Sequence, residues 1–145
     1  MTAIYTIGFT GKSAEEFFTI LKNVGVKRVI DVRLYPSTQL SGFARKKDLA
    51  FFLKNLCKIG YQHNFELAPT DEILKGYKDG KISWAEYEVE YIKLLENRNV
   101  ANDTNPNLLD GACFLCAEKT PEQCHRRLLA EYLQNKLKNV EIKHI

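Results

Sequence analysis

The sequence predicts an α/β protein, a single-domain three-layer sandwich in which helices cover both faces of a mostly parallel five-stranded sheet. Short runs rich in β-branched and aromatic residues alternate with longer runs whose apolar residues recur at helical spacing. A chain of 145 residues, 45% apolar and 27% charged, has the size and composition of a globular domain that buries its core unaided. We therefore expect residues 1–145 to form one domain.

The first part of the chain predicts two strands joined by a helix. Residues 3–9, "AIYTIGF", and residues 27–33, "KRVIDVR", are short, apolar and β-branched, as buried parallel strands are. Ser13, followed three residues later by Glu16, forms a capping box that predicts a helix start, and Gly25 predicts its end. This helix is expected to bury its apolar residues, namely Phe17, Ile20, Leu21 and Val24.

Residues 34–47, "LYPSTQLSGFARKK", break the periodicity and predict a long connection of the kind that often carries function. A second helix is predicted from apolar residues at helical spacing, namely Leu49, Phe52, Leu53 and Leu56. Gly60 is expected to end it, and residues 61–67, "YQHNFEL", are predicted as the third strand.

Residues 70–99 carry no strand signal and predict a helical insertion between the third and fourth strands. The remaining elements are predicted as a loop at 102–107, a fourth strand at 111–116, a helix at 120–137 and a fifth strand at 140–145. Thr120 is expected to cap the last helix, with Pro121 at its first position.

Because right-handed crossovers join parallel strands, we expect the strand order 3-2-1-4-5. Ligands of such sheets bind beyond the carboxyl ends of the strands. Polar and glycine-rich features follow the first, second and fourth predicted strands, which would be neighbours and would line one crevice. These candidate residues are Gly8, Thr10 and Gly11, then Asp31, Arg33, Pro36 and Ser37, then Cys116 and Glu118, and on the last helix Cys124, His125 and Arg126.

The net charge of +3 is too small to predict a nucleic-acid partner by itself. The chain starts without a leader pattern and has no long apolar stretch, so we expect a cytoplasmic protein with no membrane association. Its four cysteines are then expected to be free thiols. No residue pattern predicts a particular cofactor.

The first candidate region, "TIGFTGKS", ends in the Gly-Lys-Ser of a phosphate-binding loop but lacks the loop's first glycine. Thr6 occupies that position, and Gly8 comes two residues late. The shortened loop still offers an anion the free N–H groups of a helix start. Gly8 and Gly11 are equally consistent with a tight turn alone.

Asp31 and Arg33 alternate with period two along their predicted strand, so their side chains lie on the same face. They form either a structural ion pair or part of a polar cavity. Two charges at a buried strand end need partners, which favours the second interpretation.

Cys113 and Cys116 have C-x-x-C spacing, but an odd separation on one strand sends their side chains to opposite faces. They are therefore not expected to share a metal. Cys113 is predicted to be buried, whereas Cys116 ends the strand and opens into the crevice, with Cys124 or His125 as its partner. Cys124, at the fourth position of the predicted helix, fits a structural role as well as a reactive one.

Four segments together resemble the domain of unknown function 488 family: "TIGFTGKS", "VIDVRLYPSTQLSGF", "SWAEYEVEYIKLL" and "FLCAEKTPEQCHRRLLAEYL". The most specific pattern consists of Cys116, Glu118, Pro121, Cys124, His125 and Arg126, with the earlier Asp31, Val32 and Arg33. The resemblance implies a single-domain α/β protein whose site uses these polar residues. It implies no established activity.

The leading hypothesis is an enzyme or binding protein for a phosphate-bearing or otherwise anionic ligand. Arg33 and Arg126 would clamp the anion through charge-assisted hydrogen bonds. Asp31 or Glu118 would act as general base. Cys116, Cys124 and His125 would then supply a nucleophile with its proton acceptor.

Two other hypotheses belong to different classes. A noncatalytic nucleic-acid-binding module would use the basic segment "FARKK" from Phe43 to Lys47 together with "HRR". A structural zinc site would use Cys116, Cys124 and His125, but it needs a fourth ligand, and adjacent residues in the first turn of a helix point in divergent directions. The zinc site ranks last among the three.

Overall fold

The computed structural model describes residues 1–37 and 42–145. Its five parallel strands form one sheet in the order β3-β2-β4-β1-β5. The strands are β1 (Thr2–Gly8), β2 (Arg28–Asp31), β3 (Gly60–His63), β4 (Ala112–Cys116) and β5 (Val140–His144). The α/β class and the parallel sheet are confirmed.

The predicted strand order 3-2-1-4-5 is wrong, because β4 lies between β2 and β1. All five residues of β4 are buried, whereas β1 keeps half-buried side chains at Thr2, Ala3 and Tyr5. The central position of a parallel sheet is covered on both faces, so it suits the strand that has no polar side chain. β1, β2 and β4 nevertheless remain neighbours, and their carboxyl ends share one edge.

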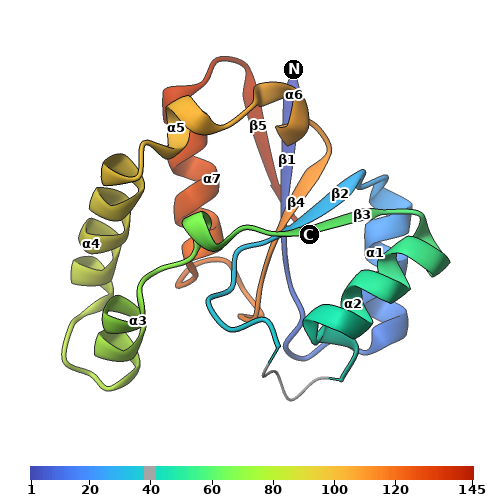
Figure 1. Cartoon of the computed structure of the whole chain (residues 1–145), viewed down its shortest axis with the longest axis horizontal. Helices are drawn as coiled ribbons and strands as arrows, with labels where there is room; N and C mark the ends of the chain where they lie inside the picture. Colours follow the sequence, from blue (N-terminus) through green and yellow to red (C-terminus); the bar gives the residue numbers. More distant parts are fainter. Residues whose placement is uncertain (38–41) are drawn as a thin grey trace.

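Helices cover both faces of the sheet (Figure 1). The first face is covered by α1 (Ala14–Val24) and α2 (Lys46–Phe52), and the second by α7 (His125–Lys136), against which α4 (Trp84–Asn97) packs. Each face has its own core of buried apolar side chains. Within the described ranges, every helix is too short or too polar to cross a lipid bilayer.

The capping boxes predict two helix starts correctly. Ser13 accepts a hydrogen bond from the Glu16 backbone at the start of α1, and Ser83 does the same for Glu86 at the start of α4. Gly25 ends α1 with a left-handed φ of 83°, which glycine adopts without strain.

The segment between β3 and β4 is helical, as predicted for residues 70–99, and the helices continue beyond it. It contains α3 (Asp71–Lys78), α4, α5 (Val100–Asp103) and α6 (Pro106–Leu109). The last two occupy most of the predicted loop. The Asn105 side chain caps α6 by accepting from the Asn107 backbone, and Pro106 stands in its first turn, where no N–H is needed.

Two predicted boundaries in the middle of the chain need correction. The second helix continues past α2 as a π-helical turn, Leu53–Cys57, and ends at Lys58 in a left-handed conformation rather than at Gly60. This change of period leaves the Leu56 side chain exposed. The third strand stops at His63, and a 3₁₀ turn, Phe65–Leu67, follows; another 3₁₀ turn, Gly42–Ala44, precedes α2.

The last helix, α7, begins four residues later than predicted. Its N-cap is Cys124, with extended backbone angles φ −138° and ψ 138°, rather than Thr120. The preceding loop is held by a tertiary contact, since the Arg126 Nη1 donates to the Glu118 carbonyl at 2.6 Å. Thr120 therefore does not cap the helix, because the hydrogen bond from Arg126 to Glu118 holds this loop around the buried guanidinium.

Candidate functional site

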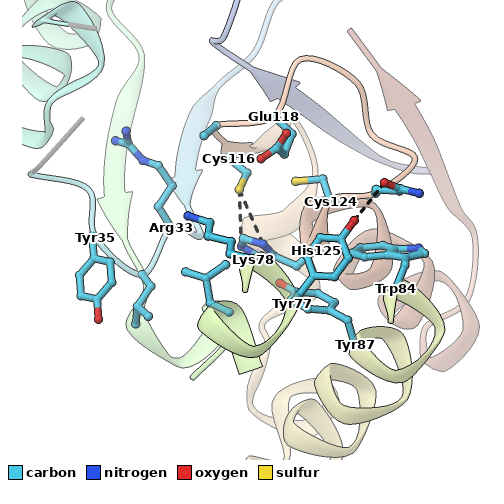
Figure 2. Close-up of a pocket in the computed structure, with 14 residues that line it drawn as sticks. Arg33, Tyr35, Tyr77, Lys78, Trp84, Tyr87, Cys116, Glu118, Cys124 and His125 are labelled. Atoms are coloured by element: carbon cyan, nitrogen blue, oxygen red, sulfur yellow. Dashed lines mark hydrogen bonds between the residues drawn. The ribbon is translucent and has the colours of Figure 1, made fainter. Parts of the chain in front are cut away.

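A cavity of about 150 Å³ opens at the carboxyl edge of the sheet, beside the ends of β2 and β4 (Figure 2). Arg33 and Cys116 reach it from these two strands, and His125 reaches it from the start of α7. Helices α3 and α4 supply aromatic side chains on the other side, namely Tyr77, Trp84 and Tyr87. We call this cavity the edge pocket.

Three donor side chains meet in the edge pocket and form what we call the thiol–imidazole cluster: Cys116, Cys124 and His125. One donor atom from each lies within 4.8 Å of the others. The Cys116 Sγ lies 3.6 Å from Nδ1 and 3.7 Å from Nε2 of His125. All three side chains are buried, so the cluster forms part of the pocket floor rather than of the open surface.

Cys124 and His125 converge although they are neighbours in sequence. The expectation that they diverge assumes a helix over both residues, and it fails because Cys124 is the extended N-cap and only His125 is helical. Cys113 stays apart, as predicted from the strand alternation. It packs in the core of the α1 face, whereas Cys116 belongs to the core of the α7 face.

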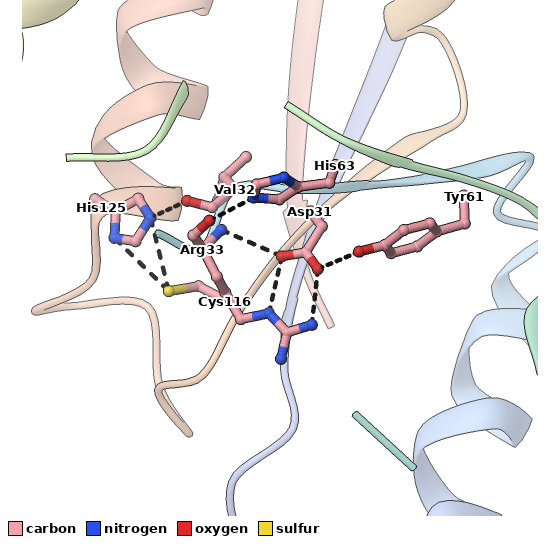
Figure 3. A network of polar contacts seen from close by, with 7 residues as sticks. All are labelled: Asp31, Val32, Arg33, Tyr61, His63, Cys116 and His125. Atoms are coloured by element: carbon pink, nitrogen blue, oxygen red, sulfur yellow. Dashed lines mark hydrogen bonds and ion pairs between the residues drawn. The ribbon is translucent and has the colours of Figure 1, made fainter. Parts of the chain in front are cut away.

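A backbone hydrogen bond determines which nitrogen of His125 is free. The His125 Nε2 lies 2.7 Å from the Val32 carbonyl, which can only accept, so Nε2 carries the proton and donates it (Figure 3). In the neutral imidazole this tautomer leaves the lone pair on Nδ1. The ring of Tyr91 packs edge-on against the imidazole at 5.5 Å, and the Tyr91 hydroxyl donates to the Leu67 carbonyl, which fixes both rings.

The two thiols of the cluster differ in acidity. A hydrogen bond from Cys124 lowers the pKa of Cys116, and the backbone of Ala117 and the positive charge of Arg126 act in the same direction, against the effect of burial. The pKa of Cys124 is raised by that same hydrogen bond and by burial. Cys116 is thus the thiol that ionises first, and Cys124 stays protonated beside it.

Asp31 and Arg33 form a buried two-point ion pair (Figure 3). The Arg33 Nε and Nη2 donate to the two carboxylate oxygens at 2.8 and 2.7 Å, and the Arg33 backbone donates to Oδ1 at 3.2 Å. The Tyr61 hydroxyl donates to Oδ2 at 2.6 Å, and burial raises the pKa of Tyr61, which keeps this donor protonated. The carboxylate is surrounded by donors, so Asp31 holds Arg33 rather than acting as a free base.

The positive charge of Arg33 is held in place by burial and by its contacts. Its side chain is 3% exposed, its guanidinium lies 5.3 Å from the Phe9 ring centre, and its Nη1 has no hydrogen-bond partner within the described residues. His63 Nε2 contacts the Arg33 carbonyl at 2.7 Å. Tyr61 and His63 were not identified from the sequence, although their period-two spacing on the third strand, next to Asp31, was a usable signal.

Arg126 is buried and does not line the edge pocket. It is 1% exposed and forms no ion pair with a carboxylate in the part of the chain that is described. Its charge also lowers the pKa of Lys12, second to burial. The expected clamp of Arg33 and Arg126 on one anion is therefore not assembled, and Arg126 acts as a buried source of positive potential.

Gly8 permits a close approach of backbone rather than contact with a ligand. A Cβ there would lie 1.6 Å from the Glu118 carbonyl oxygen and 2.9 Å from the Arg126 Nη1. Gly11 forms the following turn with φ 81°, and the Thr10 N–H donates to the Ala117 carbonyl at 3.1 Å. The turn after β1 thus supports the loop that carries Glu118.

Two further candidates lie away from the pocket. Pro36 is buried, and its carbonyl accepts from the Lys46 backbone, whereas Ser37 is exposed and borders residues 38–41, which lie outside the described part. Neither lines the edge pocket. Glu118 does line it, as do Lys78 of α3 and the aromatic side chains of α3 and α4, none of which the sequence marked except Glu118.

The fold and the site define a class: a parallel α/β protein with a buried thiol–imidazole cluster in a pocket at the carboxyl edge of its sheet. The family described as "Domain of unknown function DUF488" matches residues 13–133, and the chain belongs to this family. Searches of curated proteins and of solved structures returned no match.

Proposed function

We propose that this chain is an enzyme that acts on a small anionic molecule in the edge pocket, with the thiol–imidazole cluster as its reactive centre. The observation that carries this proposal is the meeting of Cys116, Cys124 and His125 at the floor of a pocket that also contains cationic and aromatic groups. A structural core does not require a thiol, an imidazole and a cavity at one place. A pocket that gathers a nucleophile and a proton acceptor is the usual setting of a reactive centre.

The charges around the pocket favour an anion. Arg126 is buried without a carboxylate partner in the part of the chain that the structure describes, and its positive potential extends to Cys116. Lys78 reaches the pocket from α3 and forms no ion pair within the described residues (Figure 2). Among the described residues, the Arg33 Nη1 is a further buried donor without a hydrogen-bond partner. Glu118 is the opposing charge, and a ligand carrying a negative group relieves the excess of positive potential.

The shape of the pocket favours a ligand with a flat group. Trp84 stacks on Tyr87 at 4.8 Å between ring centres, and Tyr77 packs at an angle to both. A cavity of about 150 Å³ holds one six-membered ring. We therefore expect the pocket to bind an aromatic monoanion or phosphate ester more tightly than inorganic phosphate.

The proposal can be tested by ligand binding, because Trp84 is the chain's single tryptophan and lies in the pocket. Phenyl phosphate and inorganic phosphate are titrated while Trp84 fluorescence is followed. We expect saturable binding of phenyl phosphate that Lys78→Ala weakens roughly tenfold, the effect of losing a charge-assisted hydrogen bond. Lys81→Ala removes the same charge nearby but outside the pocket, and it should leave the affinity unchanged.

The reactive centre is tested separately by alkylation of the reduced, chelator-treated protein. Iodoacetate and iodoacetamide differ mainly in charge, so a positive pocket raises the preference for iodoacetate at Cys116. Lys78→Ala should reduce this preference, and Lys81→Ala should not. Absence of phosphate-ester binding, equal effects of the two lysine variants, or a Cys116 that stays unlabelled in the native protein would each count against the proposed function.

The structure supports the nucleic-acid hypothesis less well than it supports an enzyme for a small anion. The Phe43 ring packs against Phe17 and Phe18 in the core rather than standing free to stack on a base. Arg126 is buried, and Arg127 pairs with Glu88 and Glu131. No observation on the described residues favours this second function.

A further inference from the structure

We propose that Cys116, Cys124 and His125 bind a zinc ion, whose fourth coordination position faces the edge pocket. This inference concerns the cluster itself and does not depend on whether the pocket takes an anionic ligand. The sequence ranked a zinc site last among three hypotheses, whereas the geometry of these three residues supports one.

The first argument is the distance between the donors. In a tetrahedral zinc site with Zn–S of about 2.3 Å and Zn–N of about 2.1 Å, sulfur and nitrogen ligands lie about 3.6 Å apart and two sulfurs about 3.8 Å apart. The Cys116 Sγ and the His125 Nδ1 lie 3.6 Å apart. No separation within the cluster exceeds 4.8 Å, so closing all three donors onto zinc takes movements of about 1 Å.

The second argument is the orientation of the imidazole. Histidines that bind metals donate their other ring N–H to a carbonyl or carboxylate, which fixes the tautomer and the ring. In this chain His125 Nε2 donates to the Val32 carbonyl at 2.7 Å, and the packing of Tyr91 holds the ring. In the neutral imidazole, this arrangement fixes the ring and leaves the Nδ1 lone pair available to bind a metal.

The third argument concerns the choice of metal and the open position. Two thiolates and one imidazole suit zinc, and sites with three protein ligands leave a fourth position for water or substrate. Within the described part of the chain, the cluster contains three donors and no fourth, and it lines a cavity of about 150 Å³. Such a cavity has room for about five waters. The missing ligand that argued against a structural zinc site is what a reactive zinc site requires.

Cobalt substitution tests the inference, because Co²⁺ takes the place of zinc and reports its ligands by absorption. The reduced protein is stripped with a chelator and titrated with Co²⁺ without oxygen. We expect one equivalent to bind, with thiolate-to-cobalt charge-transfer bands in the near ultraviolet and the intense visible bands of tetrahedral cobalt. One equivalent of Zn²⁺ should abolish the spectrum.

Two variants and one control make the test specific. Cys124→Ser removes a thiolate but leaves a favoured N-cap residue, so the start of α7 is preserved. We expect this variant and Cys116→Ser to bind Co²⁺ more than about 100-fold more weakly, beyond the effect of changing a neighbour of a ligand. Cys57→Ser removes a thiol on the other face of the sheet and should bind like wild type.

The outcomes are decisive in each direction. A reduced protein with native circular dichroism that binds no stoichiometric Co²⁺ would overturn the site, and so would a cluster variant that keeps the wild-type spectrum. The open position is tested by adding azide to the cobalt protein: a change in the visible bands supports it, and an unchanged spectrum overturns it. None of these results depends on phenyl phosphate, so the zinc site and the proposed function can fail separately.

Discussion

At the scale of single residues, the site depends on whether each buried charged group finds hydrogen-bond and ion-pair partners. Asp31 accepts four hydrogen bonds, three from Arg33 and one from Tyr61. A buried ion pair is tolerated only when its remaining donors and acceptors find partners. The same principle marks Arg33 Nη1 and Arg126 Nε as exceptions, because they are buried donors without partners among the described residues.

Tyr61→Phe tests this account at the residue scale. The variant removes the hydroxyl that donates to Asp31 at 2.6 Å and leaves a buried carboxylate oxygen with one partner fewer. We expect the free energy of unfolding in urea to fall by about 1–3 kcal/mol. Tyr5→Phe is the control, since its hydroxyl makes no hydrogen bond to the described residues. Equal losses in the two variants would show that ring packing, not the hydrogen bond, is responsible.

At the scale of elements, the contact between the end of β1 and the loop before α7 places the cluster. Gly8 lies against the Glu118 carbonyl, which accepts from Arg126 in the first turn of α7. This contact sets where α7 begins. The start of α7 in turn decides that Cys124 and His125 point toward Cys116 instead of apart.

Gly8→Ala tests that dependence. The new Cβ would lie 1.6 Å from the Glu118 carbonyl oxygen, which belongs to backbone and cannot rotate away. We expect a loss of about 1–3 kcal/mol in the free energy of unfolding, the usual cost of overpacking, together with weakened Co²⁺ binding. Gly42→Ala is the matched control, because its Cβ would meet no atom of the described residues within 4 Å. A stable Gly8→Ala protein with wild-type cobalt spectra would refute the role of this contact.

At the scale of the whole molecule, β4 joins the two cores. Cys113 and Leu115 of β4 point into the core of the α1 face, and Ala112, Phe114 and Cys116 point into the core of the α7 face. The strand is the only element of the sheet buried at every position among the described strands. Loss of packing on one face is therefore transmitted to the other.

Leu21→Ala tests this coupling. Leu21 of α1 is fully buried in the core opposite Trp84, and truncation of such a side chain costs about 2–5 kcal/mol. We expect the unfolding transitions followed by Trp84 fluorescence and by far-ultraviolet circular dichroism to coincide and to shift together. Leu56→Ala, at an exposed leucine, should leave both unchanged. A Trp84 transition that does not move would mean that the two faces unfold independently.

The sequence by itself determined the features that depend on near neighbours in the chain. Capping boxes at Ser13 and Ser83, the alternation that separates Cys113 from Cys116, and the placement of Asp31 and Arg33 on one face are local consequences of backbone geometry. The sequence favoured a polar cavity for these two charges, whereas the structure pairs them with each other. The parallel α/β class follows from the same periodicities.

Only the tertiary structure decided the strand order, the start of α7 and the aromatic wall of the pocket. Each depends on a contact between distant segments: β4 between β2 and β1, the loop of Glu118 around Arg126, and α3 and α4 over the cluster. A local pattern predicts which conformation a segment prefers, but burial energy summed over the whole core decides which preference is kept. The capping signal at Thr120 was overridden in this way, and the thiol–imidazole cluster is the result.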